Sequence, residues 1–288
     1  MTKKPKIAFF GTPEISVIVL NELKKAKLAP ELVVTMSDKP KGRKLVMTPP
    51  PAKVWAQENK VDFVQPAKLD ESFLDLLREG GFDLFVVASY GKILKQELLD
   101  IPKHGTLNVH PSLLPKLRGA SPIISAILEN EQKTGVTIML LDAGMDSGPI
   151  LAQASIEAEP WPPKAIDLGE LLVTEGGKML AEVIPRWIAG EIKPEVQDHD
   201  KATFTKKITK EDGLIELDGD AYQNLLKIRA FNEWPGTYFF ADRDTNSASR
   251  RIRVKITDAD LDGDKLIIKR VVPEGKKEMD YEDFLRGN

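Results

Sequence analysis

The 288-residue chain contains no cysteine. Disulfide frameworks, thiolate metal sites and cysteine nucleophiles are therefore excluded, and the absence suits a reducing compartment. Histidine is also scarce, and three scattered residues make no metal-ligand set: His104, His110 and His199. No apolar run approaches the ~18 residues of a membrane-spanning helix, and the first residues lack the long apolar core of a secretory signal. We expect a cytosolic protein that uses neither a membrane nor a metal.

The chain also lacks an excess of one charge. It carries 41 basic and 44 acidic residues, for a formal net charge of −3. This balance excludes a uniformly basic nucleic-acid binder but leaves room for a local basic patch. With 42% hydrophobic residues the chain can bury a sizeable core, and its length fits two domains of ~100–200 residues each.

Residues 1–190 alternate short apolar runs with amphipathic stretches. The predicted strands are 7–10, 31–36, 62–64, 84–88, 106–110 and 136–141, and the predicted helices are 14–25, 52–59, 71–78, 121–129 and about 165–190. This alternation predicts an α/β domain with a Rossmann-like, mostly parallel sheet and helices on both faces.

The pattern changes after residue 190. Residues 191–206 have no periodicity and are interpreted as a linker. Residues 207–288 hold one helical stretch, 221–231, and strand-like runs separated by turn residues. We expect this second domain to be a small antiparallel β unit.

Two polar residues end one of the predicted strands. Asn108 and His110 are two positions apart, so their side chains point to the same side. Ligand crevices form at strand ends in open α/β sheets. An amide and an imidazole there would donate to a developing oxyanion, and the imidazole would also move a proton. Taken alone, the pair is better explained as a common tripeptide whose histidine caps the strand.

Two neighbouring features favour the catalytic interpretation. A stiff loop with two prolines, Pro111 to Pro115, follows the strand and is suited to holding backbone groups against a flat ligand. A glycine-rich loop with two acids, Asp142 and Asp146, follows the next buried strand. Acids in loops are usually solvated turn residues, but a carboxylate near His110 would orient the ring and raise its pKa.

The segments NVHPSLLPKLRGASPI and TGVTIMLLDAGMDSGPIL closely resemble the folate-dependent formyltransferase family. The resemblance implies transfer of a formyl group from 10-formyltetrahydrofolate to an amine, with no metal. It implies that the oxyanion is held by Asn108 and protonated His110, and that Asp146 holds and charges His110. The same resemblance implies a folate pocket lined by Ser112, Leu113, Leu114 and Pro115.

The opening FFGTPEISVIVLNEL and the segment SDKPKGRKLVMTPPPAK are similar to the branch of this family that acts on methionyl-tRNA. In that branch the basic loop enters the acceptor end of the tRNA, which implies that Lys41 and Arg43 contact tRNA. Without the resemblance, such a charge run is an ordinary solvated loop.

The segments after residue 202 resemble the C-terminal, OB-like β-barrel domain of the same branch, which binds tRNA. The chain is shorter than that pattern after Trp234, so one or two strands are expected to be absent. Residues 207–288 carry 15 basic and 17 acidic residues, so RNA binding would need a local stripe. The cations of this stripe are Arg250, Arg251, Arg253 and Lys255. The alternative is a solvated face balanced by Asp258, Asp260 and Asp262.

The resemblance assigns residues 1–190 to a formyltransferase catalytic domain and residues 207–288 to a tRNA-binding domain. It implies a monomeric enzyme that formylates the free α-amine of methionine on charged initiator tRNA, for initiation of protein synthesis. A sugar-nucleotide N-formyltransferase with the same catalytic set is the alternative, which the basic loop disfavours and the shortened second domain favours. A catalytically silent RNA-binding protein is a further alternative, which the intact catalytic set disfavours.

Overall fold

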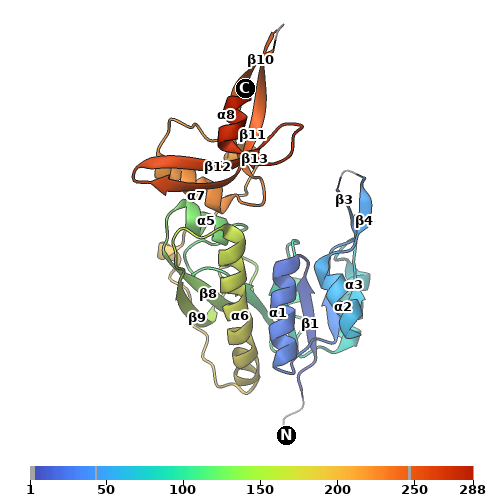
Figure 1. The fold of residues 1–288 in the computed structure, drawn as a ribbon. Helices are drawn as coiled ribbons and strands as arrows, with labels where there is room; N and C mark the ends of the chain where they lie inside the picture. Colours follow the sequence, from blue (N-terminus) through green and yellow to red (C-terminus); the bar gives the residue numbers. More distant parts are fainter. Residues whose placement is uncertain (1–3, 43, 246–247, 288) are drawn as a thin grey trace. The chain divides into compact units, whose positions relative to one another are not determined.

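The structure is a computed structural model, which describes residues 4–42, 44–245 and 248–287 (Figure 1). Its residues form two compact units. The first unit comprises Met1–Gly119, Gly135–Ile156 and Gly169–Phe204. The second comprises Ala120–Thr134, Glu157–Leu168 and Thr205–Asn288. Within the described residues, no helix is both long and apolar enough to cross a membrane.

A seven-stranded sheet forms the centre of the first unit, in the order β5-β2-β1-β6-β7-β8-β9. Its strands are β1 (Ile7–Gly11), β2 (Leu32–Val34), β5 (Asp62–Val64), β6 (Leu84–Ala88), β7 (Thr106–His110), β8 (Lys133–Leu140) and β9 (Ile150–Glu157). The first five pair in parallel, and β8 pairs with β7 antiparallel. The predicted mostly parallel sheet is confirmed.

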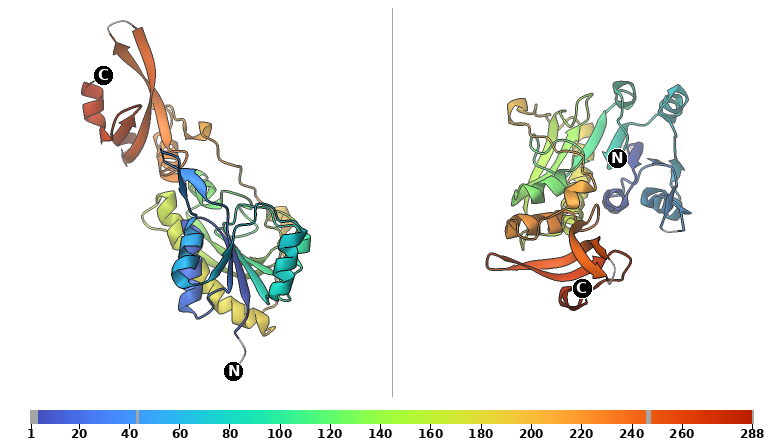
Figure 2. Two further views of the ribbon diagram at one scale, coloured as in Figure 1. Left: turned by 90° about the vertical axis from the view of Figure 1, so that its right-hand side faces the viewer. Right: turned by 90° about the horizontal axis from the view of Figure 1, so that it is seen from above.

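Helices cover both faces of this sheet, as the left view of Figure 2 shows. The helices are α1 (Glu14–Lys25), α2 (Pro51–Asn59), α3 (Glu71–Gly80), α4 (Gln96–Leu99) and α6 (Ala165–Ile188). One apolar cluster joins the sheet to α1, α2 and α6, and a second joins it to α3 and α4. The strands β1, β6 and β7 are buried along their whole length, as expected for strands covered on both faces.

The sequence did not predict a small hairpin of β3 (Lys39–Lys41) and β4 (Val46–Thr48), which pair antiparallel. The two strands lie almost wholly on the surface. Large apolar side chains are exposed in the turn and on β4: Leu45 at 70%, Val46 at 59% and Met47 at 59%. The basic loop predicted from the sequence is therefore an exposed hairpin.

The second unit holds a four-stranded antiparallel sheet in the order β10-β11-β12-β13. Its strands are β10 (Thr237–Thr245), β11 (Ala248–Asp262), β12 (Lys265–Pro273) and β13 (Met279–Asp280), and its helices are α5 (Pro122–Leu128), α7 (Ala221–Ala230) and α8 (Tyr281–Arg286). The antiparallel β unit is confirmed.

The two units are not separated by a single boundary at residue 190. Helix α5 lies in the second unit, where it packs against α7. The Asn130 side-chain oxygen, two residues after α5, accepts hydrogen bonds from Trp161 at 2.7 Å and Tyr222 at 2.9 Å. These contacts explain why the segment clusters with later residues. The functional domain boundaries at 190 and 207 stay a prediction.

Candidate active site

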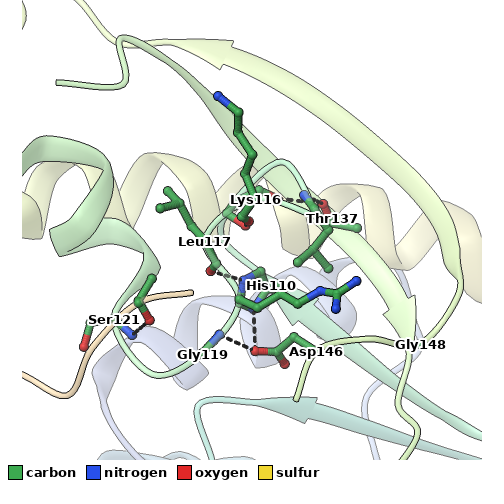
Figure 3. A network of polar contacts seen from close by, with 12 residues as sticks. His110, Lys116, Leu117, Gly119, Ser121, Thr137, Asp146 and Gly148 are labelled. Atoms are coloured by element: carbon green, nitrogen blue, oxygen red, sulfur yellow. Dashed lines mark hydrogen bonds and ion pairs between the residues drawn. The ribbon is translucent and has the colours of Figure 1, made fainter. Parts of the chain in front are cut away.

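His110 is the last residue of β7, as the sequence predicted, and its side chain is buried with 4% of the residue exposed. Its Nε2 lies 3.0 Å from the carbonyl oxygen of Leu117 (Figure 3). A carbonyl oxygen can only accept, so Nε2 carries the ring proton of the neutral imidazole. The other nitrogen, Nδ1, is then left as a proton acceptor.

Asp146 faces that nitrogen. Its Oδ2 lies 3.7 Å from Nδ1 of His110 and accepts a hydrogen bond of 2.8 Å from the Gly119 amide (Figure 3). Asp146 belongs to the loop after β8, and its φ of +48° places it in the left-handed region, which is unusual for a residue other than glycine. The predicted approach of Asp146 to His110 is thus present in the structure.

Burial lowers the pKa of His110 below its ordinary value. The Asp146 carboxylate and the bond to Leu117 act in the opposite direction, while the Arg118 charge lowers the pKa further. Asp146 therefore acts on the pKa of His110 in the direction predicted from the sequence, and the loss of hydration acts against it more strongly. That Asp146 charges His110 during the reaction stays a prediction. Burial thus favours the neutral ring, and an ion pair with Asp146 requires that Nδ1 take up a proton.

Asn108 occupies the same strand two residues earlier and is buried, with 9% exposed. Among the described residues, none forms a hydrogen bond with its side-chain amide, and the fully buried side-chain atoms without a partner do not include those of Asn108, so the amide keeps some access to the surface. A buried amide usually has a partner. This amide is therefore available to a bound substrate, which suits an oxyanion donor.

The expected folate-pocket segment follows directly. Ser112 and Leu114 are buried, whereas Leu113 and Pro115 are half-buried and have surface to offer a ligand. The segment is held by Thr137, whose hydroxyl donates to the Ser112 carbonyl at 2.7 Å and accepts from the Leu114 amide at 3.2 Å. The backbone of this loop is thereby fixed, as a ligand-binding loop requires.

The expected tRNA-contacting residues belong to other elements of the chain. Lys41 is exposed at the end of β3, and Arg43 lies outside the described residues. Arg251 and Arg253 are exposed on β11, while Ile252, Val254 and the following Ile256 are buried. The predicted alternation of cations and aliphatic side chains along this strand is confirmed; Arg250, also expected there, has no described side chain.

The two arginines pack on aromatic rings of β10. Cζ of Arg251 lies 4.9 Å from the ring centroid of Phe240, and Cζ of Arg253 lies 5.4 Å from that of Tyr238. Asp260, named above as a possible counter-charge, instead binds Arg229 at 2.6 Å and Lys269. We call Tyr238, Phe240, Arg251, Arg253 and Lys255 the cation–aromatic face.

Two buried polar residues near His110, Arg118 and Gln197, have no role predicted from the sequence. Arg118 donates to the side-chain oxygen of Gln197 at 2.6 Å through Nη2 and at 3.1 Å through Nε. Gln197 falls in the segment interpreted as a linker. The only sequence signal for this contact is Arg118 itself, a charged residue in a largely apolar segment. Within the described residues, no group of three or more histidine, aspartate or glutamate side chains could hold a metal.

The fold is that of a formyl group-transfer enzyme, and the chain belongs to the formyl transferase family. Residues 5–184 match the family described as formyl transferase, and residues 207–265 match its C-terminal domain. The first match spans the strand-end pair and the Asp146 loop. The second ends shortly after β11, consistent with a shortened second domain.

Individual relatives and solved structures show which proteins of this kind the chain is similar to. The chain is 39% identical over 300 residues to methionyl-tRNA formyltransferase of Bacillus licheniformis, covering 98% of this chain and 95% of the relative. The methionyl-tRNA formyltransferase of Clostridium thermocellum has a similar structure, with a TM-score of 0.60, 16% identity and coverage of 93% and 98%. A sugar 3N-formyl transferase crystallised with dTDP and 5-N-formyl-THF scores 0.61, with 20% identity and coverage of 96% and 100%. The two structural matches show the fold alone.

Proposed function

We propose that the protein transfers the formyl group of 10-formyltetrahydrofolate to the α-amine of methionine on charged initiator tRNA, in the cytosol and as a monomer. The relative from Bacillus licheniformis, similar over nearly the whole chain, supports the substrate. The observation that carries the chemistry is the proton-accepting Nδ1 of His110, 3.7 Å from the Asp146 carboxylate. A folate donor supplies the formyl group and leaves as the secondary amine.

Proton transfer follows from the state of His110. The neutral ring takes a proton from the attacking amine onto Nδ1, where the Asp146 charge stabilises the resulting imidazolium. The Asn108 amide donates to the oxyanion that forms on the formyl carbonyl. His110 then returns the proton to the departing folate nitrogen as the carbon–nitrogen bond breaks. Protons balance, because the amine loses the one that the leaving group gains.

The segment from Ser112 to Pro115 is proposed to line the folate pocket, with Leu113 and Pro115 offering the contact surface. The buried hydroxyl of Thr137 supports this role, because it holds the loop backbone from two sides. A preorganised loop would bind a flat ring system without an ordering cost on binding.

Two surfaces are proposed to hold the tRNA. The hairpin of β3 and β4 would contribute Lys41 and Arg43, and the cation–aromatic face would contribute Arg251 and Arg253. Guanidinium groups on a solvent-exposed face suit phosphate contacts. The packing of both arginines on rings supports this proposal, since preorganised side chains lose less entropy when they bind.

The decisive experiment compares formyl acceptors under identical folate conditions. The protein is given charged initiator tRNA, the same tRNA without methionine, and amino-sugar nucleotides. We expect formylated methionyl-tRNA and no product from the other acceptors. Preferential formylation of an amino sugar would replace this proposal with the sugar-nucleotide alternative. Binding of tRNA with no formyl transfer to any acceptor would favour a silent RNA-binding protein.

A further inference from the structure

Residues 195–204, which we call the strap, form the last segment of the first unit. Glu195 exchanges two backbone hydrogen bonds of 2.8 Å with Ile150, at the start of β9. Farther along, the Thr203 carbonyl accepts from the Arg118 amide at 2.9 Å, and the Thr203 hydroxyl accepts from the Leu117 amide at 2.8 Å. The strap is therefore attached beside the residue whose carbonyl binds His110.

Gln197 is the buried side chain of the strap, with 4% exposed. Its amide nitrogen donates to two carbonyl oxygens of the Asp146 loop, that of Asp146 at 2.9 Å and that of Gly148 at 2.7 Å. Its oxygen accepts from Arg118. Both N–H groups of the amide are used. The strap thus holds the backbone of Asp146 directly.

Arg118 fixes the orientation of that amide. A guanidinium only donates, so the Gln197 oxygen faces Arg118 and the nitrogen faces Asp146. Arg118 is itself buried, with 4% exposed, and its other contacts are Nδ1 of His199 at 3.0 Å and the Phe204 ring at 6.0 Å. Within the described residues these partners are neutral groups or an imidazole, and all come from the strap. Burying a charge in this way is costly, so its retention calls for a role.

Asp146 needs support from several directions. Its left-handed backbone is unfavourable for a side chain with a Cβ and persists only where neighbours determine it. Gly119 holds its carboxylate, while Gln197 holds its carbonyl. A change at either contact would move Oδ2 relative to Nδ1 of His110.

We propose that Gln197, oriented by Arg118, is a positioning residue for formyl transfer, which sets the place of the Asp146 carboxylate against His110. The proposal rests on the proposed roles of His110 and Asp146. It gives a part of the chain that looks like an interdomain linker a function in the chemistry of the first unit.

Two substitutions at Gln197 separate positioning from mere anchoring. Gln197→Glu keeps an oxygen for Arg118 but places a carboxylate where the carbonyls of Asp146 and Gly148 need a donor. Gln197→Met removes both contacts. We expect both variants to lower kcat about ten- to a hundred-fold, since a misplacement of ~1 Å costs up to ~10²-fold. The KM values for folate and charged tRNA should stay within a few-fold.

The pH profile supplies a readout that a structural role would not move. In Gln197→Met, which adds no charge beside Arg118, His110 loses a partner that favours its protonated form as Asp146 shifts away, so the acidic limb of kcat/KM moves to lower pH. His199→Gln is measured in parallel, to separate a limb arising from His199. Gln65→Glu is the matched control, because its amide also donates twice within the first unit, to Met36 at 2.7 Å and Asp38 at 2.8 Å. It should leave the acidic limb in place.

The outcomes distinguish the hypotheses. If Gln197→Glu matches the wild type in kcat and pH profile while Gln197→Met loses activity, the residue only anchors Arg118 and the proposal is overturned. Lowered thermal stability with unchanged kcat and profile in both variants overturns it as well. If the wild type itself formylates no charged tRNA, the proposed function has failed instead.

Discussion

His110 and the cation–aromatic face hold their polar groups in opposite environments. His110 is 4% exposed and its proton affinity is governed by burial, whereas Arg251 and Arg253 are exposed and lie on the rings of β10. In the buried site, charges interact strongly and small displacements matter. On the exposed face, interactions beyond ~8 Å are screened at physiological salt. Activity at the buried site should therefore depend on geometry and pH, whereas binding at the cation–aromatic face should depend on ionic strength.

The largest effect is expected from removing His110. His110→Ala should lower the rate of formyl transfer by about 10²–10⁴, the usual contribution of a proton-transferring side chain. Asn108→Ala should lower it by about 10²–10³, the usual cost of losing one oxyanion donor. Folate binding, measured by fluorescence titration, should stay within a few-fold. His104→Ala is the control, since His104 lies outside the site. If folate affinity fell in step with the rate, both residues would be binding residues.

Asp146→Asn should act on rate and on pH together. The Asp146 charge raises the pKa of His110, so its removal lowers that pKa further. The base form of His110 then persists to lower pH, and the acidic limb of kcat/KM should move in that direction while the maximum rate falls. Asp142→Asn in the same loop should leave the limb unmoved, because its carboxylate binds Gly144 and Ser147. If the acidic limb of kcat/KM stays in place in Asp146→Asn, Asp146 does not act on the protonation of His110 during the reaction.

The cation–aromatic face should respond to salt. The triple change Arg251/Arg253/Lys255→Ala should flatten the dependence of log affinity for tRNA on log salt by about two to three units, since each phosphate contact contributes about 0.7–0.9. Filter binding at several salt concentrations measures this slope. Lys276/Lys277/Arg286→Ala removes three exposed cations elsewhere in the second unit and should change it less. An unchanged slope in the first variant would mean that this face binds no RNA.

The smallest effect is expected at the hairpin. Arg43→Ala removes one charge and should reduce the salt slope by about 0.7–0.9, with a higher KM or a lower rate for charged tRNA. Slow hydrolysis of the folate donor without tRNA should be unaffected. Lys60→Ala, an exposed cation after α2, provides the control. Equal loss in both assays would mark Arg43 as structural.

Sequence periodicity predicted the interior of the fold best. Strands β6 and β7 occupy the predicted residues and are buried along their whole length, because continuous burial requires continuous apolar runs. β9 was missed, since its exposure alternates along an edge strand. β11 extends to Asp262, because pairing with β12 carries it through Asp258 and Asp260 despite their low strand propensity.

The sequence by itself determined which side chains end β7 and which face of β11 carries its cations, because both depend only on the two-residue period of a strand. The tertiary structure alone decided that the pKa of His110 is lowered, since burial and the charges of Asp146 and Arg118 come from segments brought together by folding. It alone decided that Gln197 holds Asp146, 51 residues away in the chain. No local pattern specifies a hydrogen bond between such distant residues; only the packed fold does.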